Sequence, residues 1–363
     1  MTRTQLALAS TVVALLIAAG GVVVARSSAS PPSTLAFIAG GRADGPAPPV
    51  ASSGSATAPA TRVSGPTALP LSSPRQLEPA LNALGYRLPA GAAVYAARIT
   101  KEGSGLSYDD YQAGGGATAS NFWPASSIKL LAAVGALEFL GQQGFTGAAT
   151  VRFGGGAART VRSIYDGAIR ISSNDDYDTL VRLAGVDWLN KQFLTPARGF
   201  PVTVIQKSYT AAGNVRATPV LTVAEAGRTA TIPARPAGRD TDCAQVNCSS
   251  LIEMSESVRR VVLHNEIPEA DRFRISAVDA AALTDALLGA EGWFEPAVAR
   301  VLGPGARIYG KPGWVGGNDC LDVALIEARG QRYLLSAMVP ERAGGCPALV
   351  NLAANVLRVL IAA

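Results

Sequence analysis

A nearly uncharged apolar segment, NFWPASSIKLLAAVGALEFL at residues 121–140, constrains the fold of this chain more than any other stretch. From Ser126 to Leu140 the only charged residues are Lys129 and Glu138. A helix that is apolar on nearly every side usually lies at the centre of a domain. The 363-residue chain is 48% hydrophobic, so it can bury such a helix in one large domain.

The segments on both sides of this helix predict an α/β architecture of the α+β type. Strands are expected at 92–100, 306–313, 319–330 and 332–340, with a hairpin at 219–232. Helices are expected at 75–84, 160–170, 175–184, 249–265, 276–289 and 346–363. We therefore expect an antiparallel sheet built from both chain ends with flanking helices, and an all-helical lobe inserted between them.

The N-terminal region predicts export. Residues 6–25 form an uncharged, mostly apolar stretch that is just long enough to span a bilayer. We expect residues 1–26 to be a signal peptide or a membrane anchor, and the sequence leaves both open. Ala, Ser, Pro, Gly and Thr dominate residues 27–75, which is typical of a disordered linker. The folded domain would then span 76–363 in a periplasmic or other extracytoplasmic compartment, and an uncleaved segment 6–25 would make the membrane a partner.

The basic composition does not indicate nucleic-acid binding. The net charge is +5 and the pI is about 9.1. Residues 1–75 carry +4 of that charge, so the expected folded domain is almost neutral. A phosphate-backbone surface across that domain is therefore not predicted.

The four cysteines fit an exported protein. Three pairings are possible, and we favour the local one, in which Cys243 pairs with Cys248 and Cys320 with Cys346. Metal binding is the rival use of cysteine. It is weakly supported because the chain has no Cys-x-x-Cys and its only histidine is His264. We expect no metal and no other cofactor.

Lys129 is an unusual choice of residue in a chain with 27 arginines and only five lysines. It lies one helical turn after Ser126, which would occupy a helix N-terminus that favours a developing alkoxide. A desolvated lysine has a lowered pKa and can accept a serine proton near neutral pH, which arginine cannot do. Ser-x-x-Lys is nevertheless a common pattern, and a chance occurrence with a snorkelling lysine is the alternative.

Two further motifs follow in the chain. Ser172 and Asn174 form a Ser-x-Asn between two expected helices, and Lys311 and Gly313 form a Lys-x-Gly at a strand end. In this order the three motifs resemble those of the penicillin-recognising serine enzymes, the class A β-lactamases and penicillin-binding peptidases. The resemblance extends over about residues 76–363 and implies a β-lactamase/transpeptidase-like fold.

The resemblance implies a catalytic role for four residues. Ser126 would attack an amide carbonyl, and Lys129 would take its proton. Ser172 would relay that proton to the leaving nitrogen, and Lys311 would supply positive potential beside it.

The resemblance also implies three substrate-binding residues. Asn174 would hold Lys129 and a substrate amide, and the Trp314 N–H, next to Gly313, would join the Ser126 N–H in an oxyanion hole. Structural alternatives exist: Ser172 and Asn174 could cap the following helix, Gly313 could form a bulge, and Trp314 could serve packing alone.

Two departures from the family pattern affect the functional hypothesis. Pro312 occupies a position where the family has a hydroxyl residue that binds a substrate carboxylate. No Asp or Glu lies between Asp187 and Glu225, the region where class A β-lactamases carry the Glu that activates the deacylating water. Acylation is therefore better supported than efficient turnover.

Three functional hypotheses follow. The leading one is an exported serine hydrolase that forms an acyl-enzyme and acts on β-lactams or peptidoglycan-type peptides, small-molecule or peptide substrates. The second is a catalytically weak binding module of the cell envelope with the same fold. The third is a Ser-His-Asp hydrolase that uses His264, which we expect to be a surface or capping residue. The natural substrate, the deacylating base and the oligomeric state are not readable from the sequence.

Overall fold

The computed structural model describes residues 74–103, 105–116, 122–206, 208–210, 217–236, 243, 247–316 and 319–363. The expected leader or anchor at 1–26 lies outside these residues, as does the expected linker except for Pro74 and Arg75. Arg75, the last residue of the expected linker, belongs to the short strand β1.

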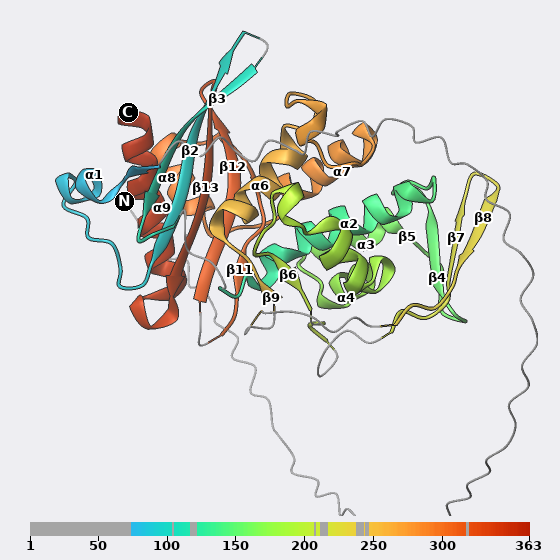
Figure 1. Cartoon of the computed structure of the whole chain (residues 1–363). Helices are drawn as coiled ribbons and strands as arrows, with labels where there is room; N and C mark the ends of the chain where they lie inside the picture. Colours follow the sequence, from blue (N-terminus) through green and yellow to red (C-terminus); the bar gives the residue numbers. More distant parts are fainter. Residues whose placement is uncertain are drawn as a thin grey trace, which may run out of the picture. The chain divides into compact units, whose positions relative to one another are not determined.

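A large sheet combines the two ends of the described chain (Figure 1). Its strand order is β1-β3-β2-β13-β12-β10, and β11 also pairs with β12. All pairs are antiparallel except β1 with β3. The strands are β1 (Arg75–Gln76), β2 (Ala93–Glu102), β3 (Gly105–Ala113), β10 (Arg307–Gly310), β11 (Gly313–Trp314), β12 (Asp319–Ala328) and β13 (Gln331–Pro340).

Helices cover both faces of this sheet (Figure 1). One face carries α8 (Glu295–Leu302) and α9 (Gly345–Ala362), with α1 (Glu78–Ala83) beside α9. The other face carries α6 (Leu251–Val262) and α7 (Ala277–Leu288), the latter packed on β10. Beyond them lie α2 (Lys129–Gln142), α3 (Val161–Arg170), α4 (Asn174–Ala184) and α5 (Val186–Trp188).

Alternation along the strands explains why the sheet is buried on both sides. In β2, Tyr95 and Ala97 join the core on the α6 side, while Val94 and Ala96 join the core beneath α8 and α9. Successive side chains of a strand point to opposite faces, so a strand buried on both sides is apolar throughout. The expected sheet from both chain ends with an inserted helical lobe is confirmed.

The structure adds strands that sequence patterns did not predict. β3 pairs with β2 along its whole length, although its sequence is polar. Its two acidic residues have partners in the folded chain: Asp109 binds Arg75 and Arg98, and buried Asp110 accepts a hydrogen bond from Tyr95. The inserted lobe is also not purely helical. It carries a second sheet of order β5-β4-β7-β8, in which β7 and β8 form the hairpin expected at 219–232, and the unpredicted pair β6–β9. Their bounds are β4 (Thr150–Phe153), β5 (Arg159–Thr160), β6 (Val204–Ile205), β7 (Leu221–Glu225), β8 (Arg228–Ile232) and β9 (Asn247–Cys248).

Both favoured disulfides are present, Cys243–Cys248 and Cys320–Cys346. They fit an extracytoplasmic protein. The second one joins β12 to the start of α9. Among the described helices, α9 is the one long and apolar enough to cross a membrane. One side of it is buried against the sheet, with Leu349, Leu352 and Leu357 fully covered, so core packing accounts for its apolar composition.

Candidate active site

Ser126 lies in a 3₁₀ turn, Ala125–Ile128, that leads directly into the central helix α2. The Lys129 N–H donates to the Ser126 carbonyl, so the two residues of the Ser-x-x-Lys motif stand one turn apart. The residue before the serine, Ala125, has a φ of 47°. A left-handed backbone at a non-glycine residue is strained and is often found at functional sites. Ser126 is half-buried.

Lys129 is completely buried, and its ammonium reaches the second motif. Its Nζ donates to the Ser172 carbonyl, to Ser172 Oγ at 3.2 Å and to Asn174 Oδ1 at 2.7 Å. Among the described residues no carboxylate forms an ion pair with this lysine. Because its side chain is buried, the lysine does not snorkel to the surface. Neutral oxygen atoms accept the hydrogen bonds of its ammonium group.

The Ser-x-Asn motif owes its geometry to the residue between its two members. Ser173 is the N-cap of α4, because its Oγ accepts from the Asp176 N–H at 3.2 Å. Ser172 and Asn174 are thus not used as the cap, and their side chains are available to the lysines. Ser172 has a φ of 56°, so the second motif also carries left-handed backbone strain.

Lys311 completes the group from the large sheet. Its Nζ donates to Ser172 Oγ at 2.9 Å, so this hydroxyl lies between two ammonium groups. Lys311 follows β10, and its N–H donates to Val323 of β12, which fixes it to the sheet. Only 1% of its surface is exposed. The structure therefore brings Lys129, Ser172, Asn174 and Lys311 together from the helical lobe and the sheet.

The two lysines have lowered pKa values. Burial, and next the charge of Lys311, lower the pKa of Lys129 to about 7. Burial lowers the pKa of Lys311 to about 8, although nearby Asp322 favours its charged form. Burial in turn raises the pKa of Asp322 to about 7, despite hydrogen bonds from backbone N–H groups such as that of Phe294. Near neutral pH, Lys129 can therefore exist in part as a free amine.

Gly313 allows the sheet to approach the turn that carries Ser126. A Cβ on Gly313 would lie 2.7 Å from the Pro124 carbonyl oxygen and 3.1 Å from the Ala125 Cβ, which is too close for any other residue. The glycine is thus required by close backbone approach rather than by a bulge. It brings Trp314, which is 55% exposed, to the same neighbourhood. Ile171, 79% exposed, stands next to Ser172.

Two contributors were missed at the sequence level, Tyr209 and Asp178. The Tyr209 hydroxyl donates to the Ala125 carbonyl at 2.6 Å, and the Lys129 ammonium lies 5.7 Å from the centre of the Tyr209 ring. Asp178 of α4 holds this loop by accepting from the Tyr209 N–H at 2.7 Å and the Thr210 N–H at 2.9 Å. Tyr209 belongs to an irregular segment without periodicity, so no sequence pattern indicated its contact with the site. For Asp178, the only indication was the cluster of acidic residues at the start of α4.

The remaining candidate residues lie in other settings. Glu225 ends β7 and accepts from the Thr146 N–H at 2.8 Å, so it belongs to the small sheet. His264 was expected at the surface or as a cap, but it is 6% exposed, and its Nδ1 has no hydrogen-bond partner within the part of the chain that the structure describes. Burial lowers its pKa, which favours the neutral ring. Pro312 offers its carbonyl to the Lys311 ammonium at 3.4 Å.

Comparisons with known proteins agree with the fold. Neither a protein-family model nor a curated protein matches the sequence. Among solved structures, PBP-A matches with 17% identity and a TM-score of 0.52, over 80% of this chain and 98% of the other. A PBP-A mutant solved as an acyl-enzyme with penicillin G gives 18% and 0.54 over the same shares. An ancestral class A β-lactamase gives 17% and 0.53, over 78% of this chain and 100% of the other.

The described chain therefore has the fold of the penicillin-recognising serine enzymes, in its class A β-lactamase and PBP-A form. Identities of this size establish the fold alone. The roles of individual residues rest on the geometry described above.

Proposed function

We propose that this protein is an exported serine hydrolase that forms an acyl-enzyme at Ser126 and acts on β-lactams or peptidoglycan-type peptides. One observation carries the proposal: the Ser172 hydroxyl lies 3.2 Å from the Lys129 ammonium and 2.9 Å from the Lys311 ammonium. Two buried ammonium groups beside one hydroxyl do not contribute to the stability of the fold, whereas such an arrangement suits the transfer of a proton through that hydroxyl.

In the proposed reaction, Ser126 Oγ attacks the amide carbonyl while its proton passes to the neutral amine of Lys129. The proton then moves through Ser172 Oγ to the substrate nitrogen as the C–N bond breaks. Lys311 keeps positive potential beside this path. The N–H groups of Ser126 and Trp314 stabilise the oxyanion, a contribution of about 3 kcal/mol in comparable sites. The ester on Ser126 is the product of this half-reaction.

Deacylation is proposed to be slow. Among the described residues no carboxylate contacts Lys129, and Glu225 is bound to Thr146 in the small sheet. A water attacking the ester would lack the carboxylate base that class A β-lactamases use. This arrangement favours a long-lived acyl-enzyme, the behaviour of a penicillin-binding protein.

The test is the intact mass of the purified domain after incubation with penicillin G. We expect one adduct of the mass of the intact antibiotic, persisting for hours. The Ser126→Ala variant should give none. Ser127→Ala is the matched control and should still be labelled, because that hydroxyl donates to the Pro124 carbonyl and does not belong to the motif. An adduct that survives in Ser126→Ala would refute the nucleophile assignment.

The second candidate, a cell-envelope binding module without catalysis, is favoured by Pro312 alone. Pro312 removes the hydroxyl and the N–H that its position would otherwise offer to a substrate carboxylate. Saturable penicillin binding without any covalent adduct at Ser126 would select this candidate.

A further inference from the structure

A cavity of about 450 Å³ lies at the end of the large sheet opposite the catalytic lysines. Arg307 at the start of β10 lines it, whereas Lys311 follows the end of that strand. The two residues are four positions apart along extended chain, a separation of about 13 Å. The β12–β13 turn, the end of β2 and Glu266 after α6 complete the walls. The cavity therefore shares no residue with the candidate active site.

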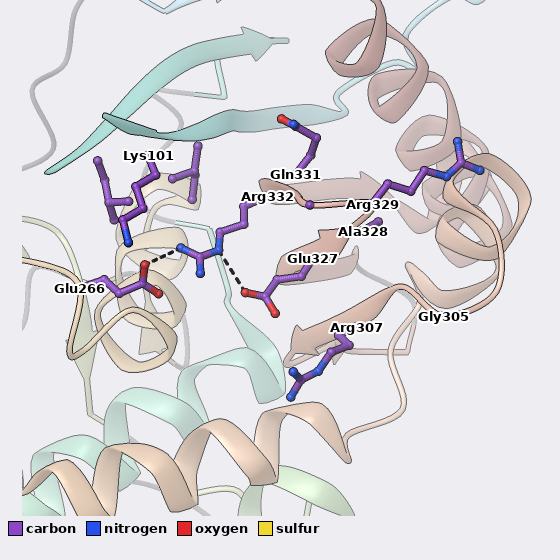
Figure 2. Close-up of a pocket in the computed structure, with 12 residues that line it drawn as sticks. Lys101, Glu266, Gly305, Arg307, Glu327, Ala328, Arg329, Gln331 and Arg332 are labelled. Carbon is purple, nitrogen blue, oxygen red and sulfur yellow. Dashed lines mark hydrogen bonds and ion pairs between the residues drawn. The ribbon is translucent and has the colours of Figure 1, made fainter. Parts of the chain in front are cut away.

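The two carboxylates of this cavity, Glu266 and Glu327, share one arginine as their ion-pair partner. Arg332 donates to Glu266 at 2.8 Å through Nη1 and to Glu327 at 3.1 Å through Nε. Glu327 also accepts from the Tyr309 hydroxyl at 3.0 Å. Figure 2 shows Arg332 between the two carboxylates, joined to both. Both carboxylates are thus held in place by Arg332 and do not project freely into the cavity.

Three further cations at the cavity have no ion-pair partner among the described residues: Lys101, Arg307 and Arg329. Lys101 and Arg307 stand on either side of the Arg332 ion pairs, and Arg329 extends away from them (Figure 2). Arg329 occupies the hairpin turn with a φ of 52°, a conformation that Gly or Asn adopts with less strain. With four cations and two carboxylates, the lining has an excess of two positive charges.

This excess contrasts with the rest of the folded chain. Residues 76–363 carry a net charge of only +1, so the cavity concentrates positive charge on a domain that is otherwise balanced. Guanidinium groups match the geometry of phosphate oxygens, and concave sites focus the potential of their charges. Ile99 and Leu106 add an apolar wall that suits the carbon skeleton of an organic ligand.

We propose that this cavity is a binding site for a phosphate-bearing ligand with at least two negative charges, held by Lys101, Arg307 and Arg332. Arg329 lies at the rim, where it meets a ligand that continues out of the cavity. The phosphates belong either to a small diphosphate or to an anionic polymer. The site is a second one, separate from the serine chemistry.

Calorimetric titration at low ionic strength tests the proposal with two probes, inorganic pyrophosphate and poly(glycerol phosphate). We expect a Kd below about 1 mM for one of them. Preference for pyrophosphate identifies a small ligand, and preference for the polymer identifies a chain that runs past Arg329. The Lys101→Gln/Arg307→Gln double variant should weaken binding at least tenfold. Both side chains are exposed, so the fold should be retained.

The matched control is Arg152→Gln/Arg162→Gln, which removes the same charge from exposed positions in the inserted lobe. It should change the Kd less than twofold. Equal weakening by both double variants would show general charge attraction and overturn the proposal, as would the absence of binding by either probe. Penicillin labelling at Ser126 should be the same in the double variant and the unaltered protein, so this test is independent of the proposed function.

Discussion

Two buried groups of cations in this molecule are built in opposite ways. In α6, Arg259 and Arg260 both bind Glu256, at 2.6 and 2.8 Å. Burial alone would raise the pKa of Glu256, but the two arginines lower it below its ordinary value. At the candidate active site, Lys129 and Lys311 share the Ser172 hydroxyl and have no carboxylate ion pair among the described residues. The group in α6 stays charged near neutral pH. The two lysines of the candidate active site have pKa values close enough to neutral to gain or lose a proton there.

On the proposed mechanism, this difference accounts for lysine at positions 129 and 311 of an arginine-biased chain. Arginine stays protonated in proteins, which suits a permanent ion pair such as that with Glu256. A buried lysine without a carboxylate partner titrates near neutral pH and can exchange a proton with a neighbour. A buried charge without a partner costs stability, and such costs are concentrated at functional sites.

The largest expected effect comes from removing the lysine that is proposed to accept the serine proton. In Lys129→Met, acylation by penicillin should slow by about a thousandfold or more, because a general base of this kind contributes about 10²–10⁴-fold. Stopped-flow acylation kinetics measure it. Lys191→Met is the matched control, since Lys191 forms a surface pair with Asp187 and should leave the rate unchanged. Normal acylation in Lys129→Met would remove Lys129 from the mechanism.

Breaking the charged group in α6 should damage folding instead. Glu256→Gln leaves two buried guanidinium groups without their carboxylate, which should lower the free energy of unfolding by about 3 kcal/mol or more. Lys129→Met, by contrast, should leave the free energy of unfolding unchanged or raise it. Urea unfolding of both variants checks the contrast, with exposed Glu291→Gln as the control. Equal losses in the two buried sites would contradict the distinction drawn between them.

The pH dependence of acylation should show the titration of the two lysines directly. Below a pH of about 7 Lys129 becomes protonated and cannot act as a base, so the rate should fall by about tenfold per pH unit. Above a pH of about 8 Lys311 loses its charge and the rate should fall again. The two lysines interact, so the apparent pKa values belong to the pair. A rate that stays constant from about pH 5 to 9 would exclude both roles.

The smallest expected effect concerns substrate contact. Trp314 is 55% exposed beside the turn of Ser126, and Trp314→Ala should weaken the initial binding of an aromatic penicillin by about threefold to tenfold. The maximal acylation rate should remain, because the proposed oxyanion hole uses the backbone N–H of Trp314. The concentration dependence of acylation separates the two. Leu84→Ala, at another exposed apolar position, should change neither.

Sequence reasoning located the elements with strong apolar patterns. The nearly uncharged α2 could only be central, and the late strands β12 and β13 are largely apolar on both faces, so they were predictable. β3 was missed because Asp109 and Asp110 break the apolar pattern expected of a strand. In the folded chain Asp109 pairs with Arg98, and Asp110 accepts a hydrogen bond from Tyr95. The small sheet was only partly foreseen, since β4 and β5 are short.

For the site, the spacing of three motifs indicated which residues could meet, and the structure shows that Lys129, Ser172, Asn174 and Lys311 do. Sequence alone could not show that Ser173 caps α4 and leaves its neighbours available, because a run of two serines does not reveal which hydroxyl turns inward. Nor could it place Tyr209 against Lys129, since that contact depends on a loop fixed by Asp178.

The sheet that joins both chain ends has a consequence for biosynthesis. β2 pairs with β13, whose partner residues lie more than 200 positions further along, as in Ala93 with Met338. A ribosome or a translocation channel releases the polypeptide from its N-terminus, so β2 stays without this neighbour until almost the entire chain has emerged. Lys311 and the strand beside it are also delivered late. On the proposed role of Ser126, nascent molecules therefore carry this serine long before Lys311 can join it, and a chain that ends upstream of β13 lacks the central partner of β2.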